Sequence, residues 1–147
     1  MLSTKLYKKV HSLAEGLLKA AQQENTEEFQ SQYVELLALC EENEGTEKNH
    51  PVQWEALADF TEESDDALPL YKKALVIAEN ESLHDYIASI NYAMAVLYEE
   101  LGETKQALAA AEQANAQAGN IVDEVLKEEI QRLISKLQPP PPHPIYG

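Results

Sequence analysis

The sequence has 147 residues, 44% of them hydrophobic, and a formal net charge of −15. Such a length suits one domain with its own core, and such a hydrophobic content excludes wholesale disorder. The acidity disfavours nucleic acid and anionic membranes and favours a basic protein partner, although it is equally consistent with a role in solubility alone.

The charge is unevenly distributed along the chain. Residues 1–20 carry four Lys and one Glu (+3), residues 21–67 carry fourteen acids and one Lys (−13), and residues 68–147 carry eleven acids and six bases (−5). The single Cys40 excludes an intramolecular disulfide. The N-terminal segment lacks the apolar core of a signal peptide, and no apolar run reaches transmembrane length. We therefore expect a soluble cytoplasmic protein.

Apolar residues recur at helical spacing along residues 1–137, which predicts seven helices in one all-α domain. The third helix is expected to start at Pro51, in a position where proline is well tolerated. Residues 138–147 contain four consecutive prolines, which predicts an extended, disordered tail. The other helices are expected at about 3–23, 27–42, 66–79, 83–101, 104–118 and 122–137.

The helix ends carry recognisable signals. Thr26 is expected to cap the second helix, and Ser82 followed by Asp85 resembles a capping box before the fifth. Gly45 and Gly119 are predicted to stop the second and sixth helices. Pro69 is expected in the first turn of the fourth helix, where proline costs little.

Two of the expected helices have apolar faces that bear on function. The last helix has a wide apolar stripe that could cap a helical array or form a homodimer contact. The stripe consists of Ile121, Val122, Val125, Leu126, Ile130, Leu133, Ile134 and Leu137. The buried face of the second helix is expected to hold Phe29, Tyr33, Leu36, Leu37 and Cys40.

The stretch from Ala88 to Asn120 places small residues where two helices would touch, around a turn at Gly102. It resembles a tetratricopeptide repeat, whose signature positions would be Met94, Ala95, Tyr98, Gly102, Ala107, Ala111 and Ala114. An earlier copy would use Trp54, Leu57, Ala58, Ala67, Tyr71 and Ala74. In that copy Thr61 replaces an aromatic residue, and the turn is about three residues short.

The two copies are forty residues apart, since Tyr71 and Ala74 precede Ala111 and Ala114 by that interval. This spacing is similar to the forty-residue variant of the repeat. A third, degenerate copy would use Leu13, Phe29, Tyr33 and Leu36. The resemblance implies a right-handed αα-hairpin solenoid with hairpins at about 3–42, 51–79 and 83–118, and a capping helix at 122–137. An unrelated helical bundle is the alternative.

No catalytic signature is present in the sequence. The four His residues are scattered without the spacing of a zinc protease, and there is no Gly-rich phosphate loop. Cys40 lies on an apolar helix face, which is typical of a core position. The acid pairs Glu62/Glu63 and Asp65/Asp66 are more typical of a solvated turn than of a cation site. We therefore predict a non-enzyme without a metal or cofactor.

The resemblance also implies that the first helix of each pair lines a concave groove. The groove positions of the 51–78 copy are Glu55, Asp59, Glu62 and Glu63, and those of the 88–121 copy are Tyr92, Val96, Glu99 and Glu100. In the degenerate copy they are His11, Ala14, Leu18 and Gln22. The predicted groove is therefore acidic, with an apolar floor around Tyr92 and Val96, although a merely solvated acidic face remains an alternative.

An acidic groove argues against the clamping of a C-terminal carboxylate and favours a basic or basic–apolar protein segment. The leading expectation is a general protein–protein adaptor. A second is a dedicated chaperone or immunity-type protein for one partner, because small acidic proteins with three such repeats resemble translocator chaperones of type III secretion. A third is a structural homo-oligomer held by the last helix.

Overall fold

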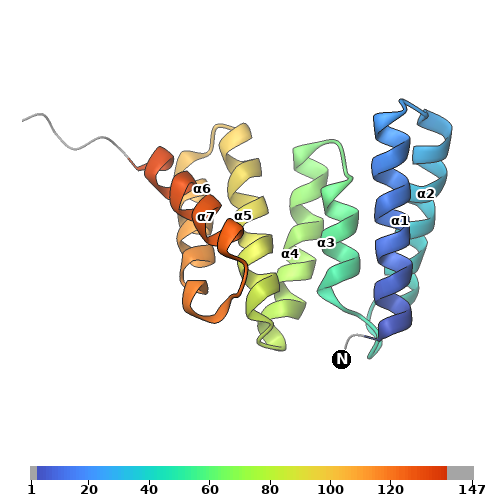
Figure 1. Ribbon diagram of the computed structural model, residues 1–147, viewed down its shortest axis with the longest axis horizontal. Helices are drawn as coiled ribbons and strands as arrows, with labels where there is room; N and C mark the ends of the chain where they lie inside the picture. The colour runs from blue at the N-terminus through green and yellow to red at the C-terminus, as the bar shows by residue number, and fades with distance from the viewer. Residues whose placement is uncertain (1–2, 139–147) are drawn as a thin grey trace, which may run out of the picture.

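Figure 1 shows the computed structural model, which describes residues 3–138. The described chain is all-helical, as predicted, and contains no strand. Residues 139–147 of the predicted tail lie outside the described residues. The helices are α1 (Thr4–Gln22), α2 (Thr26–Asn43), α3 (Pro51–Asp59), α4 (Ser64–Asn80), α5 (His84–Glu100), α6 (Thr104–Asn115), the 3₁₀ turn η1 (Ala118–Asn120) and α7 (Glu124–Leu137).

Helices α1 to α6 form a row and alternate in direction; in Figure 1 the α1–α2 pair stands at one end, with α1 in front of α2, and α3, α4, α5 and α6 follow. The closest packing joins α1 to α2, α3 to α4, and α5 to α6, and α4 also packs against α5. Helix α7 lies obliquely across the end of this row and packs mainly on α6. Short turns between antiparallel helices therefore bring consecutive helices into contact.

Three of the turns share one geometry, in which a residue with positive φ follows the helix end and the next residue donates its N–H to the carbonyl five residues before it. Gly102 has φ 76° after α5, and its neighbour Glu103 donates its N–H to the Tyr98 carbonyl at 2.8 Å. Glu24 and Ser82 occupy the same position after α1 and α4, each with φ 54°. This Schellman geometry favours glycine, and only the α5–α6 turn has one.

Several sequence-based expectations about helix ends are wrong. Ser82 does not cap α5, because it closes the turn after α4. The cap of α2 is Asn25, whose Oδ1 accepts the Glu28 N–H at 3.1 Å, and Thr26 is the first helical residue. Helix α6 ends at Asn115, before Gly119.

Helix α4 starts two residues earlier than expected, at Ser64, so Pro69 lies in its second turn with its ring exposed. Helix α7 starts at Glu124 and is capped by Asp123, whose Oδ1 accepts the Leu126 N–H at 3.1 Å. The boundaries shift because capping depends on which side chain reaches a free N–H, and sequence spacing alone does not reveal this.

The core is built from alanines at helix contacts and larger side chains between them. The signature positions of the two clearer repeat-like copies are buried, except for half-buried Tyr98 and exposed Gly102. On α2 only Leu36 and Cys40 of the expected apolar face are buried, whereas Phe29, Tyr33 and Leu37 are half-buried. Fully enclosed residues include Leu17, Leu36, Leu57, Ala74, Ile90, Ala95, Ala107, Ala111, Ala114 and Ile130.

A buried polar network joins the end of α2 to the start of α3. Asn43 donates to Gln53 Oε1 at 3.1 Å, and both Gln53 and Trp54 donate to Asn49 Oδ1 at 3.0 and 2.7 Å. Burial, with smaller contributions from nearby acids, raises the pKa of the Cys40 thiol to about 12, so the thiol is neutral and unreactive at ordinary pH. The network fixes α3 beside α2, which positions the acidic residues of α3.

Candidate partner-binding face

Among the predicted groove residues, Glu55 links two helices through a hydrogen bond. It lies on α3, is half-buried, and accepts a hydrogen bond from the Ser89 hydroxyl of α5 at 2.6 Å. Corresponding faces of α3 and α5 therefore meet at Glu55. The sequence had placed Glu55 at a groove position, but it gave no sign of the contact with Ser89.

Burial raises the pKa of the Glu55 carboxyl from 4.5 to about 7. The Ser89 hydrogen bond lowers this pKa, and the negative charge of Asp59, one helical turn further along α3, raises it. None of the ion pairs formed within residues 3–138 includes Glu55. At neutral pH the carboxyl is therefore partly ionised, and a nearby cation would complete the ionisation.

Asp59 also belongs to a contact between helices. Its carboxylate accepts a hydrogen bond from the hydroxyl of Tyr71, a buried residue of α4. Partial burial raises the pKa of Asp59, while the Tyr71 hydrogen bond lowers it. The pKa of Tyr71 is raised by burial and by the charge of Asp59, so its hydroxyl stays protonated and continues to donate. This contact holds the Asp59 carboxylate in place on α3.

A cavity of about 520 Å³ opens beside Glu55 and is lined by four carboxylates. No Lys, Arg or His lines it. Burial and the charge of Glu55 raise the pKa of Tyr86 to about 12. The lining is formed by Glu55 of α3, Asp85, Tyr86 and Ser89 of α5, and Val122, Asp123, Leu126 and Glu129 at the start of α7.

Apolar side chains are exposed next to these carboxylates. Val122 is 84% exposed and lines the cavity, and Val125, one residue before the cavity-lining Leu126, is 62% exposed. Both were expected in the apolar stripe of the last helix. Most of that stripe packs against the rest of the chain, since Ile130 and Leu133 are buried. The exposed apolar surface of α7 is therefore concentrated at its start, beside the acidic cavity.

The predicted apolar floor faces the chain's own last helix. Tyr92 and Val96 of α5 are half-buried and line a space of about 480 Å³ together with Arg132 and Leu133 of α7. Lys136 Nζ lies 3.0 Å from Glu99 Oε2. The part of the groove that was expected to be open is therefore already faced by α7, an amphipathic helix with three acidic and three basic residues.

The remaining predicted groove residues are more scattered. Helix α3 ends at Asp59, so Glu62 and Glu63 lie in the turn before α4, and Glu100 accepts a hydrogen bond from Ser64 at 3.3 Å. On α1, His11 lies 2.7 Å from Glu15, Leu18 and Gln22 are exposed, and Ala14 is half-buried. Sequence reasoning missed Asp85, Asp123 and Glu129, because nothing local in the sequence indicates where α7 returns.

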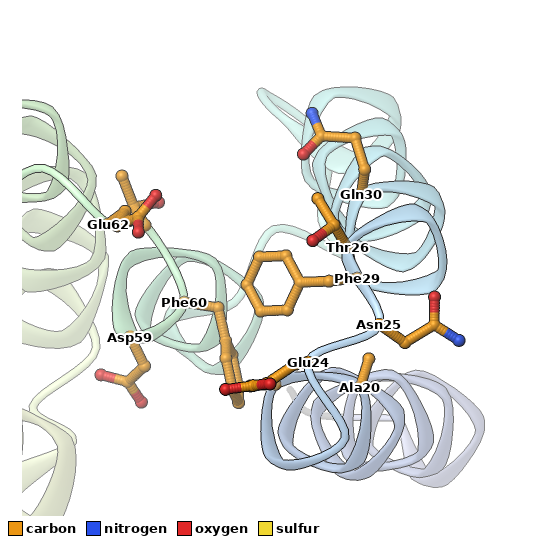
Figure 2. Close-up of a pocket in the computed structure, with 11 residues that line it drawn as sticks. Ala20, Glu24, Asn25, Thr26, Phe29, Gln30, Asp59, Phe60 and Glu62 are labelled. Atoms are coloured by element: carbon orange, nitrogen blue, oxygen red, sulfur yellow. The ribbon is translucent and has the colours of Figure 1, made fainter.

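A second cavity, of about 630 Å³, lies between the α1–α2 turn and the α3–α4 turn (Figure 2). Phe29 of α2 and Phe60, the residue after α3, meet edge to face in its wall with ring centroids 6.3 Å apart. Its full lining is Ala20, Ala21, Glu24, Asn25, Thr26, Phe29, Gln30, Asp59, Phe60, Thr61 and Glu62. The sequence marked Phe29 as an apolar residue of the second helix but gave no sign of a cavity.

Comparisons of the chain with protein-family models, with curated proteins and with solved structures found no match. Among the described residues, no helix is both long enough and apolar enough to cross a bilayer. Within residues 3–138, no group of three or more His, Cys, Asp and Glu side chains is arranged to hold a metal ion. The functional proposal therefore depends on the acidic face, by which we mean the four carboxylates that line the cavity beside Glu55 together with Asp59.

Proposed function

We propose that this chain is a non-enzymatic protein–protein interaction module that binds a basic segment of a partner protein on its acidic face. In this proposal the helix pairs form a right-handed tetratricopeptide-like solenoid with α7 as its terminal cap. Two observations support that architecture: neighbouring helices pack in pairs, and Gly102 at the α5–α6 turn has a left-handed backbone conformation. The partner would lie along α3 and α5, the first helices of their pairs.

The observation that carries the proposal is the environment of Glu55. Its carboxyl is held between α3 and α5, burial raises its pKa to about 7, and the adjoining cavity has four acidic lining residues and no basic one. Ionising such a group without a counter-charge is unfavourable. A lysine or arginine of a partner would supply that charge, so the site is poised for a cation.

Helix α7 illustrates the kind of segment that such a face accepts. Lys136 pairs with Glu99, and Leu133 lies with the half-buried Val96 around the same space. Beside α5 the chain thus already places two basic side chains and one apolar side chain of α7, together with the acidic Glu129. Exposed Val122 and Val125 beside the acidic cavity favour a partner segment that also carries apolar residues.

The proposal is tested by affinity capture from the native host at low and high salt, with mass-spectrometric identification. The test variant is Glu55→Gln with Asp85→Asn, and the control is Glu79→Gln with Glu112→Gln, which removes two exposed charges from α4 and α6. We expect basic partners to be captured by the wild type and by the control, and to be lost at high salt and with the test variant. Equal capture by the test variant would contradict the acidic-face mechanism.

The number of captured partners separates the remaining alternatives. One stoichiometric basic partner would indicate a dedicated chaperone or immunity-type protein, and several weak ones a general adaptor. Capture of the chain alone would favour the homo-oligomer, for which the exposed apolar residues Val125 of α7 and Val122 just before α7 are left to make the contact. Substitution of Val125 by Asp tests that contact without disturbing the buried stripe.

A further inference from the structure

The cavity in Figure 2 arises from a mismatch in helix length. Helix α3 has nine residues whereas α1 has nineteen, and in Figure 1 the α3–α4 turn lies lower than the α1–α2 turn. The first turn of α2 therefore extends past the end of α3 and is left uncovered on that side. Phe29 and Phe60 line the resulting hollow instead of being enclosed in the core.

The hollow combines aromatic and acidic side chains. Phe29 and Phe60 meet at an interplanar angle of 65°, and Tyr33 stacks on Phe29 with centroids 6.4 Å apart. In Figure 2, Glu62 lies on one side of the two rings and Glu24 on the other. None of the eleven lining residues is Lys, Arg or His.

Negative charges beside aromatic rings make a favourable environment for a cation. A cation near the face of an aromatic ring is attracted by the ring's quadrupole, and nearby carboxylates add to this attraction. An adjoining cavity of about 180 Å³ shares both Phe rings and extends the acidic lining to Glu63 and Asp66. The excess of negative charge around the rings therefore continues beyond the hollow itself.

The same combination holds one of the chain's own cations elsewhere. Lys73 Nζ lies 4.6 Å from the centroid of the Trp54 ring, and it is also paired with Glu44. In that case the cation comes from α4, the ring from α3 and the carboxylate from the end of α2. The hollow near Phe29 has the ring and carboxylate components but no cation among its lining residues.

We infer that this hollow binds the side chain of an arginine from the partner segment, with the guanidinium against Phe29 and Phe60 and between Glu24 and Glu62. A planar guanidinium stacks on aromatic faces and donates to carboxylates at the same time, which an ammonium does less well. The inference rests on the proposed function, because Asp59 lines the hollow and lies one helical turn from Glu55 on the same helix. The arginine in the hollow would fix one end of the partner segment that lies along α3 and α5.

The test is an NMR titration of the full chain with N-acetyl-arginine methylamide, against the neutral isostere N-acetyl-citrulline methylamide and the corresponding lysine probe. We expect the arginine probe to shift the ring and amide signals of Phe29 and Phe60, with weaker shifts from lysine and none from citrulline. Equal shifts from citrulline, or stronger ones from lysine, would overturn the inference. An absence of shifts at the two rings would also overturn it.

Variants locate the effect. Glu24→Gln with Glu62→Gln is expected to weaken arginine binding roughly three- to ten-fold, because two exposed carboxylates are lost. Phe29→Leu, which keeps an apolar residue, is expected to weaken it roughly three-fold. The double variant Glu79→Gln with Glu112→Gln should leave binding unchanged. Undiminished binding in the first two variants would overturn the assignment.

The readouts distinguish this inference from the proposed function. Shifts confined to Glu55 and Asp85 would overturn the arginine pocket while leaving the acidic face supported. Shifts at Phe29 and Phe60, combined with unchanged partner capture by the Glu55→Gln and Asp85→Asn variant, would keep the pocket and contradict the proposed role of Glu55.

Discussion

Replacement of Glu55 by Gln is expected to stabilise the protein above neutral pH. Gln has nearly the same shape and can still accept the Ser89 hydrogen bond, but it never carries the buried charge. The pKa of Glu55 is about 7 in the folded chain and 4.5 when unperturbed. Full ionisation of Glu55 thus costs up to about 3 kcal/mol of folding free energy, and about 1–3 kcal/mol once partial exposure is considered.

The sign of the pH dependence follows from which state holds the proton. Between pH 4.5 and about 7 the folded chain keeps the Glu55 proton whereas the unfolded chain has lost it, so the stability contributed by Glu55 rises as the pH falls through this window. The advantage of Glu55→Gln should therefore be greatest near pH 8. It should shrink towards zero as the pH falls below 4.5, where both states of the wild type become protonated.

Urea unfolding of both proteins across this pH range, followed by far-UV circular dichroism and the fluorescence of the single Trp54, measures the difference. The exposed Glu112→Gln on α6 is the matched control, and its effect should stay within about 0.5 kcal/mol at all pH values. If Glu55→Gln were no more stable than the wild type at pH 8, or if its advantage did not vary with pH, the account of Glu55 would be refuted.

Three further predictions concern the fold. Burial lowers the pKa of His50, whose Nδ1 caps α3, so in a Glu55→Gln background stability should fall as the pH drops below 6.5, and His50→Asn should remove this dependence in the same urea titration. Gly102→Ala should destabilise by about 1 kcal/mol and Ser82→Gly should stabilise by up to about 1 kcal/mol, because both positions have positive φ. Ala95→Leu should lower stability by about 1–3 kcal/mol, because Ala95 is fully enclosed between helices, and thermal unfolding measures the loss.

The helices could be predicted from the sequence because their signals are local. Apolar periodicity located all seven, and Gly102 and Pro51 marked a turn and a helix start that the structure contains. Ends governed by one side chain were less predictable, as Asn25 and Ser82 show. The tetratricopeptide assignment of these helices stays a prediction.

The candidate site was only partly predictable, because it depends on contacts between distant segments. The repeat-like spacing placed Glu55 and Asp59 on one face of α3, and both lie there. The return of α7 was not predictable, although it brings Asp123 and Glu129 to the cavity and places Lys136 against Glu99. Likewise, the hollow at Phe29 was not predictable, because it arises only when the short α3 packs beside the longer α1 and α2.

The central claim is that the Glu55 carboxyl is only partly ionised in the free chain and becomes fully ionised when a cation of the partner binds beside it. The most direct test is the pKa of Glu55, followed by NMR of its side-chain carboxyl carbon in the free protein and with a captured basic partner. The account predicts about 7 in the free chain and a fall towards the unperturbed 4.5 on binding, with release of a proton near neutral pH. An ordinary pKa in the free protein, or a raised pKa that binding leaves unchanged, would contradict it.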